Sequence, residues 1–89
     1  MNNSKEDQRI RLLVVDDEQS IRKLCSTVAE ALGFVCLEAE SGESALALLE
    51  EQSVHIILSD MVMPRMSGLE FLERVKKLLP RTEVALMTG

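Results

Sequence analysis

Three carboxylates and one hydroxyl stand where short apolar runs of the sequence end. Asp16 and Asp17 follow the first run, Asp60 follows the third with one serine between, and Thr88 follows the fourth. If these runs are parallel strands of one sheet, their carboxyl ends meet at the same edge and bring the carboxylates together. Like charges crowded in this way repel one another and destabilise a fold, and a bound cation relieves the repulsion.

The ligand chemistry of such a cluster favours a hard cation, because it offers oxygen atoms without histidine or cysteine. A site with few carboxylates leaves room for water and phosphate, which suits Mg²⁺ better than Ca²⁺. The sequence has no EF-hand spacing and no Gly-rich phosphate loop, so a bound nucleotide is not expected. Taken by itself, however, Asp60 fits a residue that opens a turn equally well.

The runs that precede these residues have the composition of short buried strands. Residues 10–15 and 56–58 are too short for helices and are almost wholly aliphatic, with several β-branched side chains. Residues 34–40 partly alternate between apolar and polar side chains, and residues 83–87 form a fourth apolar run. The sequence therefore predicts four strands.

Helical patterns separate the four strands. Residues 21–32 carry apolar side chains at helical spacing, and Gly33 is placed to end that helix. A second helix is predicted to start at Ser41, and a third spans residues 67–79 and stops before Pro80. The βαβαβαβ order predicts an α/β fold whose mainly parallel sheet has helices on both faces.

Length and charge limit the classes of function. The 89 residues fit one small domain, with residues 1–9 as a polar tail and residues 10–89 as the folded part. A formal net charge of −5 argues against binding to nucleic acid or to an anionic membrane. The sequence shows neither a secretion signal nor an apolar stretch long enough to span a membrane, so a cytoplasmic location is expected.

The cysteines and the histidine do not suggest a further site. Cys25 and Cys36 are too few and too far apart for a CxxC redox pair or a metal knuckle, and both fall on apolar positions of predicted elements. We expect them to pack in the core. His55, the single histidine, has no second metal-binding residue type beside it and is expected to start a strand.

Three motifs in order resemble the receiver domains of two-component response regulators. They are VVDDE at the first strand, LSDMVMPRMSG at the third and ALMTG at the fourth, and the resemblance covers residues 10–89. It implies a flavodoxin-like (CheY-like) doubly wound parallel sheet. It also implies a phosphoacceptor domain that receives a phosphoryl group from a sensor histidine kinase or a phosphotransfer protein.

The resemblance assigns a role to each residue that matches the motifs. Asp60 is expected to be the phosphoacceptor, and its carboxylate would attack the phosphorus of a phosphohistidine. Asp16, Asp17, Asp60 and the backbone carbonyl of Val62 are expected to hold Mg²⁺. Thr88 matches the switch hydroxyl of the family.

Pro64 and Gly68 match the residues that shape the loop after the acceptor, but the end of the sequence departs from the family. A complete receiver continues past the threonine with a helix, a fifth strand and a fifth helix, which carry a lysine and an aromatic switch residue without counterparts here. We therefore expect a C-terminally incomplete receiver, truncated after the fourth strand. Its uncovered apolar face and open sheet edge favour self-association or partial unfolding.

Two other functions compete with the phosphorylation switch, which is itself not expected to be an enzyme. A Mg²⁺-dependent phosphohydrolase resembling the haloacid dehalogenase family needs a DxDxT pattern, and the sequence reads DDEQS after the first strand. A non-phosphorylated interaction or dimerisation module is the second alternative. The set of Asp16, Asp17, Asp60 and Thr88 argues against that module, while the missing lysine leaves it open.

Overall fold

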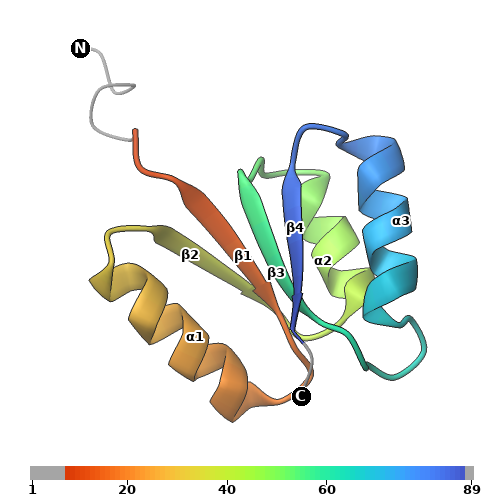
Figure 1. Cartoon of the computed structure of the whole chain (residues 1–89), viewed down its shortest axis with the longest axis horizontal. Coiled ribbons are helices and arrows are strands. Elements are labelled where there is room, and N and C mark those ends of the chain that lie inside the picture. Colours follow the sequence, from red (N-terminus) through yellow and green to blue (C-terminus); the bar gives the residue numbers. More distant parts are fainter. Residues whose placement is uncertain (1–7, 88–89) are drawn as a thin grey trace.

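The computed structural model describes residues 8–87, which form four strands and three helices in strict alternation (Figure 1). In chain order the elements are β1 (Arg11–Val15), α1 (Gln19–Ala31), β2 (Val35–Ala39), α2 (Gly42–Leu49), β3 (Ile56–Asp60), α3 (Gly68–Leu78) and β4 (Glu83–Met87). The predicted βαβαβαβ order is confirmed. The third strand is longer than predicted, so Asp60 is its last residue and does not lie in the loop that follows.

All four strands are parallel and lie in the order β2-β1-β3-β4. The central pair is β1 and β3, in a register that places Val15 opposite Ser59. The residues that follow β1 therefore reach the same edge of the sheet as the end of β3. Both outer strands continue this register, with Val15 opposite Ala39 and Asp60 opposite Met87.

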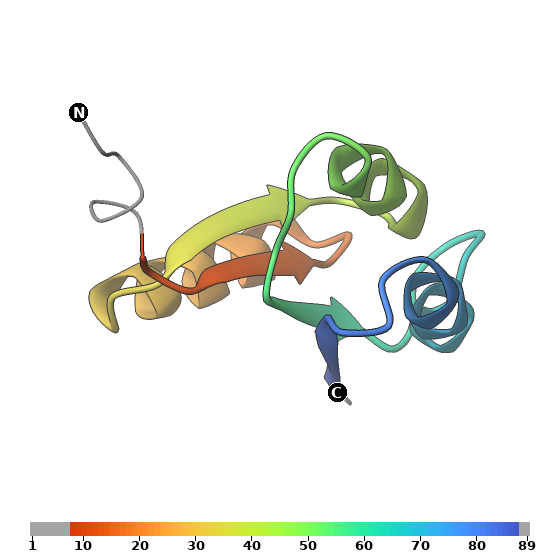
Figure 2. The same cartoon turned by 90° about the horizontal axis from the view of Figure 1, so that it is seen from above.

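Helices cover both faces of the sheet, as predicted (Figure 2). α2 and α3 lie on one face, where Leu13, Ile57, Phe71 and Val75 are fully buried in the larger of two apolar clusters. α1 lies on the other face over β1 and β2. None of the helices within residues 8–87 is long and apolar enough to cross a membrane.

The two cysteines belong to the smaller cluster under α1, which confirms the expectation that they pack. Cys25 and Cys36 are partly buried there against Leu12, Val14 and Ala29. Burial raises the pKa of the Cys36 thiol, and the nearby Glu38 and Glu30 carboxylates add to the shift while a hydrogen bond with Ser26 opposes it. A raised pKa disfavours the reactive thiolate.

One part of the apolar pattern of α1 remains exposed. Leu24, Val28 and Leu32 are 61%, 50% and 71% exposed, although their spacing predicts a buried stripe. Together with Leu12 and Leu58 they border a shallow apolar groove. These side chains are exposed because α1 lies over β1 and β2, and no helix among residues 8–87 covers β3 and β4 on this face (Figure 2).

Gly33 ends α1 in the way the sequence predicts. Its φ of +98° lies in the left-handed region, and its N–H donates to the carbonyl oxygen of Glu30 at 3.0 Å. A Cβ added at this position would meet no atom within 4 Å. Any loss of stability on substitution must therefore come from the backbone conformation.

We predict that Gly33→Ala lowers the free energy of unfolding by about 1 kcal/mol, because an L-residue resists the left-handed conformation. Gly33→Asn should cost roughly half as much, since asparagine tolerates this region better than alanine does. Urea unfolding of both variants measures the difference. An alanine variant as stable as the original chain would contradict this account of the helix end.

Candidate functional site

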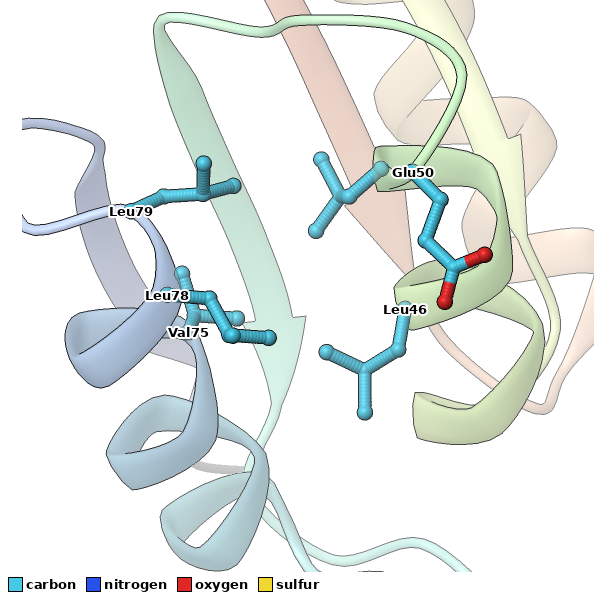
Figure 3. Close-up of a pocket in the computed structure, with 6 residues that line it drawn as sticks. Leu46, Glu50, Val75, Leu78 and Leu79 are labelled. Carbon is cyan, nitrogen blue, oxygen red and sulfur yellow. The ribbon is translucent and has the colours of Figure 1, made fainter.

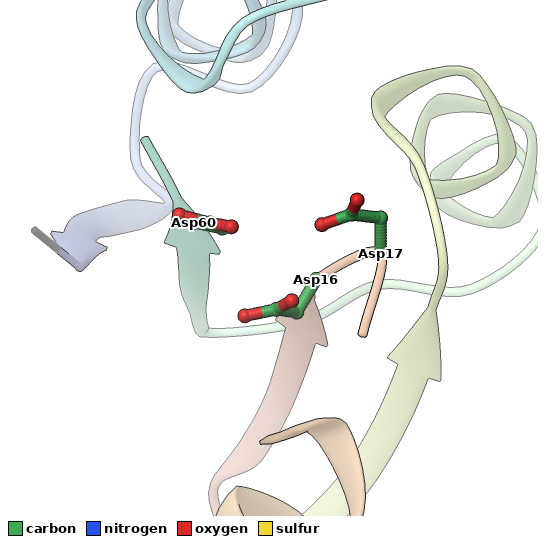
Figure 4. A group of neighbouring side chains, drawn as sticks. All are labelled: Asp16, Asp17 and Asp60. Carbon is green, nitrogen blue, oxygen red and sulfur yellow. The ribbon is translucent and has the colours of Figure 1, made fainter. Parts of the chain in front are cut away.

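Three acidic side chains converge at the carboxyl edge of the sheet (Figure 4). Asp16 and Asp17 follow β1, and Asp60 ends β3. One carboxylate oxygen of each residue lies within 4.8 Å of those of the other two. Asp16 is 3% exposed, Asp60 is half-buried and Asp17 is exposed, so the cluster is open to solvent on one side. The predicted convergence of these residues is confirmed.

Backbone N–H groups fix two of these carboxylates. The N–H of Glu18 donates to Oδ1 of Asp16 at 2.9 Å, and the N–H of Val62 donates to Oδ1 of Asp60 at 3.2 Å. Each bond is local, between residues two apart, and orients a carboxylate without a side-chain partner. The oxygens that remain are the ligands that Mg²⁺ prefers.

Arg22 is a site residue that the sequence analysis missed. Its Nη1 donates to the carbonyl oxygen of Asp16 at 2.8 Å, and its Nε lies 3.5 Å from Oε1 of Glu38 on β2. The side chain is only 14% exposed, so it anchors the loop after β1 to the neighbouring strand. A basic residue in the first turn of the helix after an acidic pair was the available signal.

The loop after β3 is held at both ends. The N–H of Met61 donates to the carbonyl oxygen of Met87 at 3.1 Å, which ties the loop to β4. The N–H of Gly68 donates back to the carbonyl oxygen of Met61 at 2.9 Å, and Ser67 caps α3 by accepting from the N–H of Glu70. Asp60 thus directly precedes a loop whose two ends are joined by the hydrogen bond between Gly68 and Met61.

Gly68 and Pro64 shape this loop. A Cβ at Gly68 would collide with the carbonyl oxygen of Asp60 and would lie 2.7 Å from Cα of Met61, so only glycine lets α3 start so close to the acidic residue. The carbonyl oxygen of Pro64 accepts from the N–H of Met66 at 2.7 Å. Between them Arg65 has a φ of +67°, in the left-handed region that is uncommon for residues other than glycine.

The described residues do not test two of the predicted roles. Thr88 lies outside the described residues. For Val62 the structure gives the hydrogen bond of its N–H to Asp60, whereas the ligand role of its carbonyl stays a prediction.

A parallel sheet in this strand order, with its acidic side chains at the carboxyl edge, defines the CheY-like class of α/β proteins. The sequence profile described as response regulator receiver domain matches residues 12–89. The chain belongs to this family, which consists of signalling domains of two-component systems.

Curated relatives share this part of the chain. Over 83 residues the chain is 34% identical to the autoinducer 1 sensor kinase/phosphatase LuxN of Vibrio campbellii, a match that covers 93% of this chain and 10% of LuxN. It is 37% identical over 70 residues to the probable chemotaxis protein CheY of Rhizobium etli, covering 78% of this chain and 54% of that protein. The chain thus spans between a tenth and about half of the length of these relatives.

Solved receivers have the same fold. The response regulator TrrA of Thermotoga maritima aligns with a TM-score of 0.85 and 34% identity, covering 89% of this chain and 69% of that one. The chemotaxis protein CheY4 of Vibrio cholerae aligns with a TM-score of 0.84 and 31% identity, covering 88% and 67%. These likenesses confirm the predicted fold class.

We predict that Gly68→Ala destabilises the chain by about 1–3 kcal/mol, because the new methyl group meets the backbone of Asp60 and Met61 and forces a shift. Gly42→Ala is the matched control, since Gly42 also follows a capping serine and begins a helix. Its Cβ would meet mainly Sδ of Met66 at 2.7 Å, and that flexible side chain can move.

The two variants are compared by urea unfolding and by the amide chemical shift of Asp60. Gly68→Ala should change both quantities, and Gly42→Ala should leave the Asp60 shift in place. Equal losses of stability in the two variants, with the Asp60 shift unmoved, would contradict the close packing of α3 on the acceptor strand.

Proposed function

We propose that this chain is a phosphoacceptor receiver domain in which Asp60 takes a phosphoryl group from a phosphohistidine. The donor is a sensor histidine kinase or a phosphotransfer protein. The convergence of three carboxylates from two strand ends carries this proposal, because one of them can act as nucleophile while the others hold a cation.

The cation in this proposal is Mg²⁺, held by Asp16, Asp17, Asp60 and the backbone carbonyl of Val62. The cluster fits a hard ion because its oxygens lie within 4.8 Å of one another and no nitrogen or sulfur ligand is among them. The related TrrA of Thermotoga maritima is described in complex with Mg(2+)-BeF. When bound, Mg²⁺ neutralises charge on the phosphoryl oxygens.

Asp60 is the acceptor in this scheme because it matches the acceptor position of the family motif, and its environment is compatible with that role. Asp16 is 3% exposed, too buried for the imidazole of a partner to approach in line. The half-buried Asp60 has Oδ1 fixed by the N–H of Val62, so the carboxylate is oriented before attack. An oxygen of Asp60 forms the new O–P bond as the P–N bond breaks, and the departing nitrogen keeps the bonding electrons.

Thr88 completes the proposed site as the switch hydroxyl. It directly follows Met87, whose register partner across the sheet is Asp60. A hydroxyl that donates to a phosphoryl oxygen on Asp60 would draw the end of β4 toward the acceptor. This role rests on the match of Thr88 to the family motif.

The remaining expectations are part of the same proposal. Residues 10–89 act as the receiver unit, in the cytoplasm, without contact to nucleic acid and without enzymatic turnover. Self-association through the exposed edge of β4 or through Leu24, Val28 and Leu32 also stays a prediction. The exposure of these side chains supports it.

We predict that Mg²⁺ stabilises the chain. At ten times its dissociation constant, binding to the folded state alone adds about 1.4 kcal/mol, which raises the melting temperature by roughly 5–10 °C. Asp17→Asn should remove most of this rise, while slightly stabilising the metal-free chain by relieving repulsion. Glu73→Gln is the control, an exposed α3 substitution outside the cluster.

Thermal unfolding monitored by circular dichroism, with and without Mg²⁺, measures both effects. A Mg²⁺ response that is the same in Asp17→Asn and in the original chain would contradict the proposed metal site. Ca²⁺ at the same concentration should produce the smaller rise, because this site offers few protein ligands.

We predict that acetyl phosphate with Mg²⁺ adds one phosphoryl group to the chain, and that Asp60→Asn abolishes the addition because the amide is not a nucleophile. Intact-mass spectrometry measures the label. Glu73→Gln, which changes an exposed carboxylate outside the acidic cluster, is the control and should label like the original chain.

The two other functions give different results in this experiment. A phosphohydrolase consumes many equivalents of acetyl phosphate without stable labelling, and a pure interaction module takes up no label at all. Either result would contradict the proposal that Asp60 is the acceptor of a signalling switch.

A further inference from the structure

An apolar groove lies between α2 and α3 (Figure 3), and none of the residues that line it belongs to the acidic cluster. Leu46 and Leu49 of α2 form one wall, and the other wall comes from α3 and the residue after it. That second wall consists of Val75, Leu78 and Leu79, and Glu50 lies at the edge. Leu78 is 68% exposed, so a large aliphatic side chain faces solvent at the groove. We call this surface the α2–α3 groove.

The size of the α2–α3 groove favours side chains of a protein over a small-molecule ligand. Its volume is about 230 Å³, whereas sites for drug-sized ligands usually measure about 300–1,000 Å³. Aliphatic walls of this extent suit one or two large apolar side chains, the usual anchors of protein interfaces.

The rim of the groove carries one acidic residue. Glu50 directly follows α2, at the helix end where the dipole is negative, and the last turn of α2 carries no basic residue. None of the ion pairs found within residues 8–87 involves Glu50. A partner that fills the groove therefore meets negative charge that calls for a lysine or arginine.

Lys76 and Lys77, in the last turn of α3, do not supply the positive charge that would neutralise Glu50. Lys76 Nζ is engaged by the carbonyl oxygens of Thr82 at 2.6 Å and Pro80 at 3.5 Å. Lys77 is two residues after Val75, about 200° around the helix, and so points away from the groove. Among the residues that line the groove, the charged one is therefore Glu50.

We propose that the α2–α3 groove docks an amphipathic helix of a partner protein. This helix presents two large aliphatic side chains one turn apart and a lysine or arginine beside them, which meets Glu50. A helix satisfies its own backbone hydrogen bonds, and the groove between two helices offers no free strand edge for an extended peptide. The docking does not depend on phosphorylation of Asp60.

The test uses a designed helical peptide with leucines at positions i and i+4 flanked by lysines, and a twin peptide with glutamates in place of the lysines. Binding is measured by fluorescence anisotropy and mapped by amide chemical shifts. The lysine peptide should bind at least about threefold more tightly than the glutamate peptide at low salt. Its shifts should map to Leu46, Glu50 and Leu78.

Variants test the charged contact and the apolar contact of the proposal separately. Glu50→Gln should weaken the lysine peptide about threefold and leave the glutamate peptide unchanged or slightly tighter. Leu78→Ala should weaken both peptides at least about fivefold and is tolerated by the fold, because this side chain is mostly exposed. Glu73→Gln is the control on another face of α3 and should change neither affinity.

Several results would overturn the proposal. These are no binding of the lysine peptide at millimolar concentration, equal binding of the two peptides, or shifts centred on Leu24 and Val28 of α1. Sedimentation that shows a dimer, lost in Leu78→Ala, would assign the groove to a second copy of this chain instead. Acetyl phosphate labelling of Glu50→Gln should remain normal, so failure here is distinct from failure of the phosphoacceptor proposal.

Discussion

The parallel pairing of β1 with β3 is the constraint on which the rest of the structure depends. The register that sets Val15 opposite Ser59 brings Asp16 and Asp17 to the same edge as Asp60, although more than forty residues separate them in the chain. Fully buried aliphatic side chains of both strands pack in the apolar clusters on the two faces of the sheet and stabilise this pairing. The hydrophobic core thus determines the geometry of a polar site.

Backbone N–H groups and one arginine hold the segments that carry the acidic residues. Two local N–H donors orient the carboxylates of Asp16 and Asp60, and Arg22 holds the carbonyl oxygen of Asp16 while pairing with Glu38. The backbone around the acidic cluster is therefore positioned by contacts within the chain itself.

The fold and the acidic cluster could be predicted because each depends on a local pattern. Short aliphatic runs, helical spacing and the residues at strand ends can be recognised in the amino-acid sequence itself. An uncovered apolar face was predicted, but the exposure of Leu24, Val28 and Leu32 in particular was not, because the burial of a helix stripe depends on what else covers the same face. Arg22 was missed because its partner is a backbone carbonyl, and the need for glycine at Gly68 appears only once α3 is placed against β3.

α3 begins at the loop that closes over Asp60 and ends at the walls of the α2–α3 groove, so the two surfaces lie at opposite ends of one helix. A protein seated at the far end would leave the acidic edge accessible to a phosphoryl donor. The proposed docking helix and the proposed phosphoryl donor therefore contact opposite ends of α3, whose 11 residues span about 16 Å.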